Sequence, residues 1–385
     1  MKRIVVVGGG FGGYYALKVL SSELGEKAEV VLVDKSEYFV YLPSLPYLLS
    51  GKKKVEDLTE SFQAITRRLG ASFIKGEVVK VSLDKREITF EDGRTEKYDY
   101  LVLAAGATTE YYGIPGSEGT VPAWRLEDYL RMMNELKRGP SRICVAGGGL
   151  TGVEVAGELV EVYGPGRVTV VEKMPYLLPT LNNRRASEIA EGFLSSKGVR
   201  ILKGKGVTEV REGRLVVEGG EEVPCDIVVW ALGVRSSPVE IEGKVERVGR
   251  GRWVVVQPNL QVPGYSNVYV VGDMSHFAVD SDCAMKMAEE AILQGKTAAK
   301  NIVLQERGEK PSATHRPIFL ASKPRSLVSL GFNRAILVWE QRALFGRMPY
   351  TTKMMIESFV MRDVKGKLAG GLLTSAESTI LKTIT

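Results

Sequence analysis

The sequence predicts an α/β protein built from two Rossmann-type dinucleotide-binding domains and a C-terminal segment for membrane association or dimerisation. A glycine fingerprint occurs twice, at 8–13 and at 147–152. Each copy follows a β-branched run and precedes a stretch compatible with a helix. Each is also followed by a second strand that ends in an acid, Asp34 or Glu172. Two complete units of this kind imply that two dinucleotides are bound at once, so electrons are expected to pass between them.

The composition fits a globular protein of more than one domain. The chain has 385 residues, with 44% hydrophobic and 25% charged residues. The apolar run at 4–7 enters the glycine loop without a cleavage site, which predicts a strand and not a signal peptide. The longest uncharged run, 253–272, contains prolines and asparagines, so no transmembrane helix is expected.

The few cysteines and histidines limit which redox and metal sites the chain can form. Cys144, Cys225 and Cys283 form no C-x-x-C motif, which argues against a vicinal redox disulfide, a zinc site or an iron–sulfur cluster. We expect Cys144, inside a strand, to be a buried structural thiol and the compartment to be reducing. With only two histidines, no metal site is predicted.

The first unit, 1–112, opens as a βαβ unit. An uninterrupted β-branched run favours a buried strand at 4–7, and the later alternating segments favour a hairpin. The expected order is a helix at 14–22, a strand to Asp34, an aromatic and proline-containing stretch at 38–51, a helix around 55–69, hairpin segments at 72–81 and 87–90, and a buried strand at 98–106.

The second unit, 113–250, repeats this pattern. The segment 225–233 has the same acid, apolar run, small residues and glycine as 98–106, which indicates a duplicated domain. The other expected elements are a helix at 126–137, a helix near 183–197, and short strands at 199–203, 207–211 and 214–218.

The rest of the chain returns to the first domain and then adds a C-terminal region. Residues 251–310 contain a strand at 267–273 and a helix at 284–304. Residues 311–385 contain strand-like pieces at 325–330 and 335–339, followed by an amphipathic section and a last apolar theme at 372–373 and 380–381.

Each glycine of the first fingerprint has a separate physical role. Gly8 permits the tight turn, Gly10 lets the backbone approach a pyrophosphate, and Gly13 allows close packing of helix on strand. The helix N-terminus adds partial positive charge for the phosphates. Asp34 can accept hydrogen bonds from both ribose hydroxyls.

The order of elements resembles the two-dinucleotide-binding flavoproteins of the glutathione-reductase-like fold. Two further marks of that superfamily occur, at 104–106 and at 272–273, although Ala105 replaces the more usual threonine. The resemblance implies that the first fingerprint binds FAD and the second NAD(P)H. The implied FAD contacts are Gly8, Gly10, Phe11, Gly12, Gly13, Asp34, Lys35, Val78, Ala105, Gly106, Gly272 and Asp273.

The second fingerprint, with the helix residues up to 159, is similar to that of type II NADH:quinone oxidoreductases. The resemblance implies a catalytic Glu154 that points towards the nicotinamide–flavin contact, although the residue could also be a first-turn glutamate favoured by the helix dipole. It implies that Glu172 holds the adenosine ribose and repels the 2′-phosphate of NADPH, a preference that Lys173 and the arginines at 184–185 weaken. The implied NADH contacts are Gly147, Gly149, Thr151, Gly152, Glu172 and Gly233.

The electron acceptor is expected beside the helix that starts near Ala288. Without a redox disulfide, electrons must leave for a diffusible acceptor, and the stretch 38–47 resembles the corresponding segment of quinone reductases. The helix matches their pattern in part, because Glu289 and Leu293 replace glutamines. Quinone contacts are therefore predicted at Ala288, Glu289 and Ile292, with Glu289 as a catalytic group.

The C-terminal tail is basic. Of the net charge of +6, residues 341–385 contribute 7 basic minus 3 acidic side chains, or +4. Apolar residues at 354–361 alternate with Lys353, Arg362, Lys365 and Lys367, which could place this segment in an anionic bilayer interface. Alternatively, the segment packs on the body of the protein or on a second subunit.

The leading hypothesis is a peripheral enzyme at the cytoplasmic face of the cell membrane that transfers electrons from NADH through FAD to a membrane quinone without pumping protons. A homodimer is expected, and nucleic acid is not an expected partner. Sulfide:quinone oxidoreductase is one alternative because of Cys283. A soluble reductase of a protein electron carrier and a non-catalytic redox sensor are the others.

Overall fold

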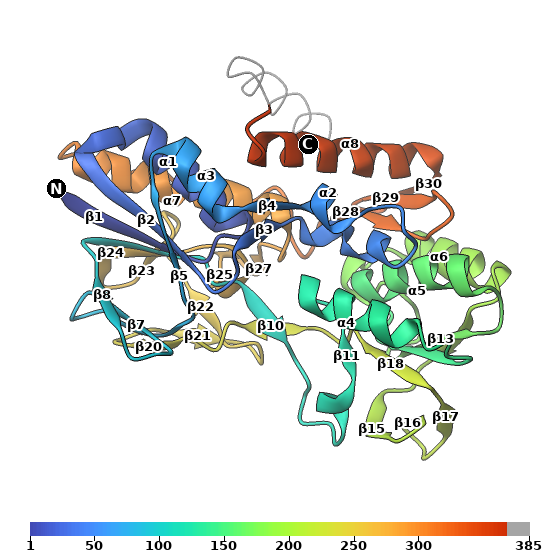
Figure 1. Cartoon of the computed structure of the whole chain (residues 1–385). Coiled ribbons are helices and arrows are strands. Elements are labelled where there is room, and N and C mark those ends of the chain that lie inside the picture. Colours follow the sequence, from blue (N-terminus) through green and yellow to red (C-terminus); the bar gives the residue numbers. More distant parts are fainter. Residues whose placement is uncertain (368–385) are drawn as a thin grey trace.

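A computed structural model describes residues 1–367 and shows two lobes bridged by a long C-terminal helix (Figure 1). The first lobe is built on a six-stranded sheet in the order β23-β24-β9-β1-β2-β5. Strands β1, β2, β5, β9 and β24 pair in parallel, and the valines and isoleucines of β1 are buried, as expected for a parallel sheet with helices over its faces. The bounds are β1 Lys2–Val7, β2 Ala28–Asp34, β5 Ser72–Lys75, β9 Tyr100–Leu103, β23 Gln261–Val262 and β24 Tyr265–Val270.

Helices and a smaller sheet complete this lobe. Helix α1 (Phe11–Leu24) packs against α7 (Ala288–Glu306), so the two ends of the chain's first domain meet. A four-stranded sheet, in the order β20-β6-β7-β8, lies beside the main sheet. Its strands are β6 Val78–Ser82, β7 Glu87–Phe90, β8 Thr95–Lys97 and β20 Glu240–Glu242. Strand β20 comes from the segment assigned by sequence to the second domain, yet it pairs with β6.

Two predicted elements of the first lobe are divided in the structure. The expected helix at 55–69 is split into α2 (Val55–Leu58), β4 (Thr59–Ser61) and α3 (Phe62–Leu69), because β4 pairs with β3 (Tyr38–Val40). The expected hairpin segment 72–81 forms β5 and β6, which belong to different sheets. The break contains Gly76, where a Cβ would lie 2.5 Å from the Phe90 ring.

The second lobe repeats the first. Its sheet has the order β11-β18-β12-β13-β14, and the series β18-β12-β13-β14 corresponds to β9-β1-β2-β5. This shared order confirms the duplicated dinucleotide-binding fold. The strands are β11 Val121–Pro122, β12 Ile143–Ala146, β13 Val168–Glu172, β14 Arg200–Lys203 and β18 Ile227–Trp230. The helices are α4 Leu126–Leu136, α5 Leu150–Tyr163 and α6 Arg184–Ser196, and an antiparallel sheet holds β15 Val207–Arg211, β16 Arg214–Val217 and β17 Glu222–Pro224.

The chain crosses between the lobes twice. Strands β10 (Ala107–Thr109) and β19 (Val234–Ser236) form an antiparallel pair at this crossing (Figure 1). Short elements fill the remaining connections: η1 Gly25–Lys27, η2 Leu42–Leu48, η3 Ser117–Gly119, η4 Pro179–Leu181, η5 Gly272–Met274, β21 Arg247–Val248, β22 Trp253–Val255, β25 Ser275–His276, β26 Ala278–Val279 and β27 Asp282–Cys283.

The C-terminal region forms a three-stranded sheet and one helix. Strands β28 (Arg325–Ser329), β29 (Ala335–Trp339) and β30 (Arg342–Gly346) lead into α8 (Arg347–Val364). Lys18 of α1 pairs with Asp363, and Lys53 pairs with Glu357, so ion pairs fix α8 to the first lobe. Within residues 1–367, none of the helices combines the length and apolar character needed to cross a bilayer.

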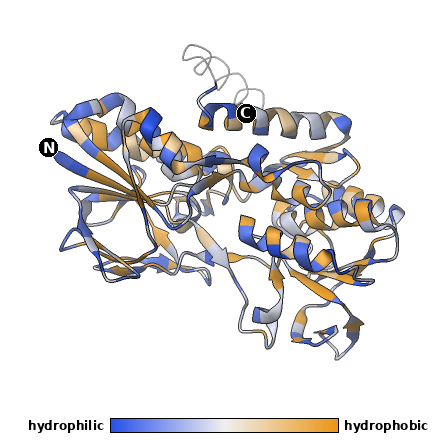
Figure 2. Ribbon diagram, in the orientation of Figure 1, coloured by the Kyte–Doolittle hydropathy of each residue, from blue (hydrophilic) through white to orange (hydrophobic). Residues whose placement is uncertain are grey.

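Part of the amphipathic tail packs on the body of the protein, which was one of the alternatives predicted for this segment. Val360 and Met361 are buried against the body of the protein, and Lys353 is also buried. The helical period shows that one face is apolar, but it does not distinguish a protein core from a membrane as the covering medium. Figure 2 shows the hydrophobic residues concentrated in the strands of both lobes. The apolar theme at 372–373 and 380–381 lies outside the described residues.

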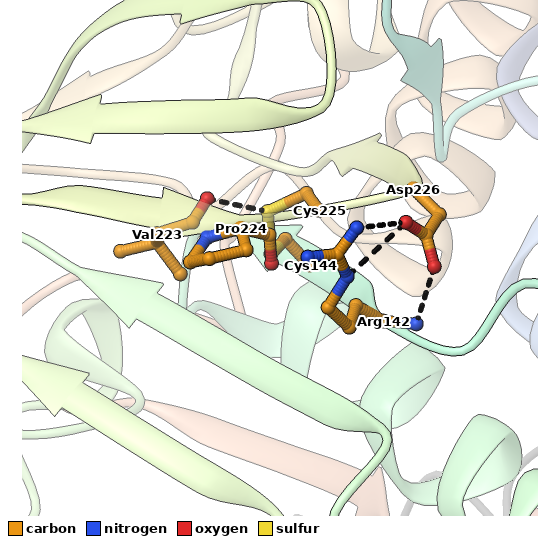
Figure 3. Close-up of a disulfide and its surroundings, with 6 residues drawn as sticks. All are labelled: Arg142, Cys144, Val223, Pro224, Cys225 and Asp226. Atoms are coloured by element: carbon orange, nitrogen blue, oxygen red, sulfur yellow. Dashed lines mark hydrogen bonds and ion pairs between the residues drawn. A yellow bond between two sulfur atoms is a disulfide. The ribbon is translucent and has the colours of Figure 1, made fainter.

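Cys144 and Cys225 form a disulfide, contrary to the expected free thiol (Figure 3). Cys144 lies in β12, and Cys225 immediately follows β17 and precedes β18, the neighbour of β12. Both residues are almost fully buried. The pairing escaped sequence analysis because the two residues are separated by 81 positions and meet only when β12 and β18 align. Cysteine usage therefore gives no support to a reducing compartment.

Candidate active site

A cavity of about 1120 Å³ lies where the glycine loop of the first lobe meets α5, α7 and α8. It is larger than the pockets that usually hold a single small ligand. Most predicted site residues line it, from elements far apart in the chain. They are Gly8, Gly10, Phe11, Gly12, Asp34, Lys35, Val78, Ala105, Gly106, Thr151, Glu154, Gly272, Asp273, Ala288 and Glu289.

The first glycine loop has the geometry of a pyrophosphate cradle. Gly8 has φ +96°, and a Cβ there would lie 2.3 Å from the carbonyl oxygen of Ala104. A Cβ on Gly13 would lie 1.7 Å from the carbonyl oxygen of Gly8, so only glycine allows this contact between helix and loop. Gly10 instead has open space and caps α1 without a side chain, which leaves the helix N-terminus accessible from the cavity.

The acid at the end of the second strand is held in the same way in both lobes. The Asp34 carboxylate accepts hydrogen bonds from the Gly9 and Ser36 amides, each at 2.7 Å. The Glu172 carboxylate accepts hydrogen bonds from the Gly148 and Met174 amides, also at 2.7 Å each. Burial raises the pKa of Asp34. The duplication therefore extends to individual hydrogen bonds.

The glycines of the second loop do not line this cavity, although Leu150 and Thr151 of the same fingerprint do. Gly147 has φ +109°, and a Cβ on Gly152 would lie 1.9 Å from the carbonyl oxygen of Gly147. Thr151, which belongs to the second fingerprint, and Glu154, which follows it in α5, both line the cavity. The predicted residues that do not line the cavity are Gly13, Gly147, Gly149, Gly152, Glu172, Gly233 and Ile292.

Glu154 is buried and contacts the C-terminal region. Its carboxylate forms an ion pair with Lys353 of α8 and accepts a 2.9 Å hydrogen bond from the Ser329 amide. The alternative interpretation of Glu154 as a first-turn glutamate favoured by the helix dipole is wrong, because α5 begins at Leu150 and its first turn contains no acidic residue. Sequence analysis missed Lys353 as a site residue because it counted this lysine among the basic residues of the tail.

Near α8 the cavity is lined by both charged and apolar side chains, with Lys353 and Ile356 contributed by α8 itself. Glu289 lies among these walls, and burial raises its pKa, an effect that the nearby Lys353 partly opposes. Ile292 packs against the core and does not line the cavity. The apolar and aromatic lining here comprises Tyr41, Leu42, Pro43, Pro46, Ala288, Phe319 and Ile356.

Gln294 of α7 has a structural contact beside the cavity. Its Oε1 accepts hydrogen bonds from the Gly272 amide at 2.7 Å and from the Ser275 hydroxyl at 3.0 Å. This contact holds the loop that carries Asp273, whose pKa is raised by burial.

Lys286 is a second cavity residue that sequence analysis missed. Its Nζ donates to the Ser275 carbonyl and lies 4.9 Å from the centre of the Trp253 ring. Burial lowers the pKa of this lysine. The residue precedes α7 by two positions, so it places a basic group next to that helix N-terminus.

The cysteines are poorly placed for chemistry in the cavity. Cys283 lies in β27, is half-buried and does not contribute to the lining. The Cys144–Cys225 disulfide belongs to a separate core cluster of the second lobe that includes Trp230. Neither position supplies a thiol to the cavity walls.

Comparison with known proteins agrees with this geometry. A family model for pyridine nucleotide-disulphide oxidoreductases matches residues 2–295. The type II NADH:quinone oxidoreductase of Staphylococcus aureus is 29% identical over 339 residues, which span 80% of this chain and 83% of that protein.

Solved structures share the fold. The sulfide:quinone oxidoreductase of Aquifex aeolicus has a TM-score of 0.82 at 19% identity, covering 99% of this chain and 96% of that one. NDH2 from Plasmodium falciparum, in complex with NADH, has a TM-score of 0.79 at 16% identity, covering 94% and 97%. At these identities the likeness concerns the fold alone, and it does not choose between the two activities.

Proposed function

The chain belongs to the pyridine nucleotide-disulphide oxidoreductase family, and on this premise we propose that it passes two electrons from NADH through FAD to a membrane quinone, without pumping protons. The observation that carries the proposal is one continuous cavity, whose lining includes the first glycine loop, the start of α5, and residues of α7 and α8. The name of the Staphylococcus relative supports the same function.

The residues around the first glycine loop fit FAD. Gly10 leaves open space for a pyrophosphate, the Asp34 carboxylate would accept hydrogen bonds from the adenosine ribose, and Asp273 would face the ribitol chain. Lys35, Val78, Ala105 and Gly106 would complete the site. When bound, the flavin supplies a centre that accepts a hydride and releases electrons.

The second glycine loop would hold NADH. Gly147, Gly149 and Gly152 would approach the pyrophosphate, with Gly233 across the loop. The Glu172 carboxylate would accept hydrogen bonds from the adenosine ribose and repel a 2′-phosphate, which favours NADH over NADPH. Glu154 would lie near the nicotinamide end, because α5 carries it into the cavity.

We favour a quinone over sulfide as the substrate that uses the remaining part of the cavity. The lining combines apolar and aromatic side chains such as Tyr41, Leu42 and Ile356 with the Glu154–Lys353 ion pair, and Ala288 and Glu289 line it from α7. Sulfide oxidation would require reactive thiols next to the flavin. Neither Cys283 nor the buried Cys144–Cys225 disulfide lines the cavity. The positions of the cysteines therefore do not favour sulfide oxidation.

An exposed apolar patch supports contact with a membrane surface. We define it as Met348 and Met355, which lie seven residues apart on one face of α8 and have exposed fractions of 55% and 68%. The exposed Arg342 and Arg347 lie beside it in the chain, and each basic group adds about 1 kcal/mol near anionic lipid. We propose peripheral attachment through this patch, on the cytoplasmic face, by a homodimer that presents both copies of the patch on one side.

Anaerobic mixing tests the electron donor. NADH should bleach the flavin absorbance within seconds, NADPH should act more slowly, and sulfide should have little effect. A flavin that stays oxidised with NADH would refute the proposal, and rapid bleaching by sulfide would favour the alternative.

Flotation with anionic liposomes tests the patch, with Met348→Asp/Met355→Asp as the variant and a substitution at exposed Val162 as the control.

A further inference from the structure

Lys286 differs from the other lysines on the cavity wall because it has no ion-pair partner. Among the described residues, three lysines line the cavity. Lys35 pairs with Glu77 at 2.8 Å, and Lys353 pairs with Glu154. Within residues 1–367, no carboxylate comes close enough to Lys286 to form an ion pair with it. One of the three cavity lysines therefore presents a charge that the protein itself leaves unpaired.

Two firmly held contacts fix the position of the Lys286 ammonium group. It donates a hydrogen bond to the Ser275 carbonyl and lies 4.9 Å from the centre of the Trp253 ring. The Ser275 hydroxyl in turn donates to Gln294 of α7 at 3.0 Å. The Trp253 ring packs against the turn before it, because a Cβ on Gly251 would lie 2.4 Å from the ring. The lysine is thus held at the cavity wall by groups that are themselves anchored.

A lysine in these surroundings is costly unless an anion compensates its charge. Burial lowers the pKa of Lys286, and Asp273 opposes this shift from beyond ion-pair distance. Burial and then the charge of Lys286 lower the pKa of His276, so the ammonium group acts on its neighbours through space. Buried charges in proteins are normally paired. The missing negative charge is therefore expected from a ligand in the cavity.

The order of groups along the cavity wall indicates which part of the proposed FAD would meet Lys286. Asp34 would bind the adenosine ribose, Gly10 the pyrophosphate and Asp273 the ribitol chain, so the flavin ring would follow beyond Asp273. Lys286 and Asp273 are electrostatic neighbours. Lys286 also lies two residues before the start of α7, whose N-terminus adds partial positive charge. Positive charge is thus gathered at the redox end of the site.

We propose that Lys286 supplies the counter-charge for the reduced flavin and so sets how readily the bound FAD accepts electrons. The inference rests on the proposed function. Hydride transfer from NADH delivers two electrons and one proton, which adds one negative charge to the flavin and leaves NAD⁺. The ammonium group stabilises this added charge more than it stabilises the neutral oxidised ring, so its effect is selective for the reduced state. Lys286 gives no atom to the reaction and acts through its charge.

The midpoint potential of the bound flavin tests the proposal. Lys286→Met removes the charge and keeps the length of the side chain. An opposite charge beside a buried group changes an ionisation equilibrium by about tenfold or more. The ratio of the affinities for reduced and oxidised flavin should therefore fall by at least about tenfold, which lowers the two-electron potential by about 30 mV. Lys286→Arg should keep most of the wild-type potential. Xanthine oxidase with xanthine and a reference dye supplies the electrons, so the measurement does not depend on NADH.

The two half-reactions should respond in opposite directions. In Lys286→Met, reduction of the flavin by NADH should be slower, because the added negative charge is less well stabilised. Reoxidation by a short-chain quinone should be as fast as in wild type or faster, since the reduced flavin gives up its electrons more readily. A distorted site would instead slow both steps, so stopped-flow measurement of the two rates separates charge from structure.

Matched variants and a stability measurement complete the test. Lys300→Met is the control, because Lys300 is an exposed lysine of the same helix that does not line the cavity. Its flavin potential should equal that of wild type. The oxidised holoenzyme of Lys286→Met should melt close to the wild-type temperature, whereas its reduced holoenzyme should melt lower, since ligand affinity contributes to stability. Lys286→Gln is a second neutral variant in case Lys286→Met folds poorly.

The contradicting results are distinct. Equal flavin potentials in wild type and in the neutral variants overturn the proposal. An equal fall in potential in Lys286→Arg, or an equal loss of melting temperature in the oxidised and reduced states, assigns Lys286 a structural role and also overturns it. A wild-type flavin that accepts electrons from xanthine oxidase but not from NADH overturns the proposed function alone. Wild-type protein that binds no FAD overturns both.

Discussion

Removal of the Cys144–Cys225 disulfide is predicted to destabilise the second lobe by about 4.5 kcal/mol. The cross-link joins residues separated by 81 positions. In the chain-entropy model, a loop of this length lowers the entropy of the unfolded chain by about 15 cal/mol/K, which gives the predicted value at 25 °C. The replacement Cys144→Ala/Cys225→Ala also loses some packing, since both side chains are buried.

Urea unfolding followed by Trp230 fluorescence measures this effect, because Trp230 lies in the same core cluster as both cysteines. With an m-value of about 2 kcal/mol/M, the midpoint should fall by about 2 M. Thiol labelling of denatured, unreduced wild type should detect one reactive cysteine, Cys283. Equal midpoints, or three reactive thiols before reduction, would refute the reasoning.

Three further predictions follow from the site. Gly13→Ala should weaken flavin binding by about 1–3 kcal/mol, because the new Cβ would collide with Gly8. Gly152→Ala should instead retain flavin and weaken NADH binding by a similar amount. Flavin content and NADH titration measure the two effects. Glu172→Gln should weaken NADH binding about tenfold and reduce the preference for NADH over NADPH. The dissociation constants of the two nucleotides measure this preference. An unchanged ratio of the two constants would contradict the role of the carboxylate. Burial raises the pKa of Glu289, so ionisation of this residue lowers stability only as pH rises above the ordinary glutamate pKa of about 4.3. Glu289→Gln should therefore raise the melting temperature relative to wild type at about pH 8 but not at about pH 4. A higher melting temperature at both pH values would point to a different cause.

Local sequence signals were enough to predict both dinucleotide-binding units. A glycine at 8 or 147 must adopt positive φ, and the acid at 34 or 172 ends a strand beside it, so the pattern is contained in a short segment. For this reason the fold class agrees with the prediction, and most residues predicted for the first fingerprint line the cavity.

Contacts made over long sequence distances could not be predicted in this way. Lys353 reaches Glu154 only because α8 lies across both lobes (Figure 1). The amphipathic pattern of α8 was compatible with lipid or protein as its cover, and burial of Val360 shows that protein covers part of it. The disulfide likewise depends on the alignment of strands that are distant in the sequence.

Sequential anaerobic mixing tests the central claim most directly. One equivalent of NADH should bleach the flavin, and one equivalent of quinone should then restore its absorbance and yield one hydroquinone per flavin. Restoration by a protein electron carrier but not by quinone, or a flavin reduced by sulfide and not by NADH, would contradict the account.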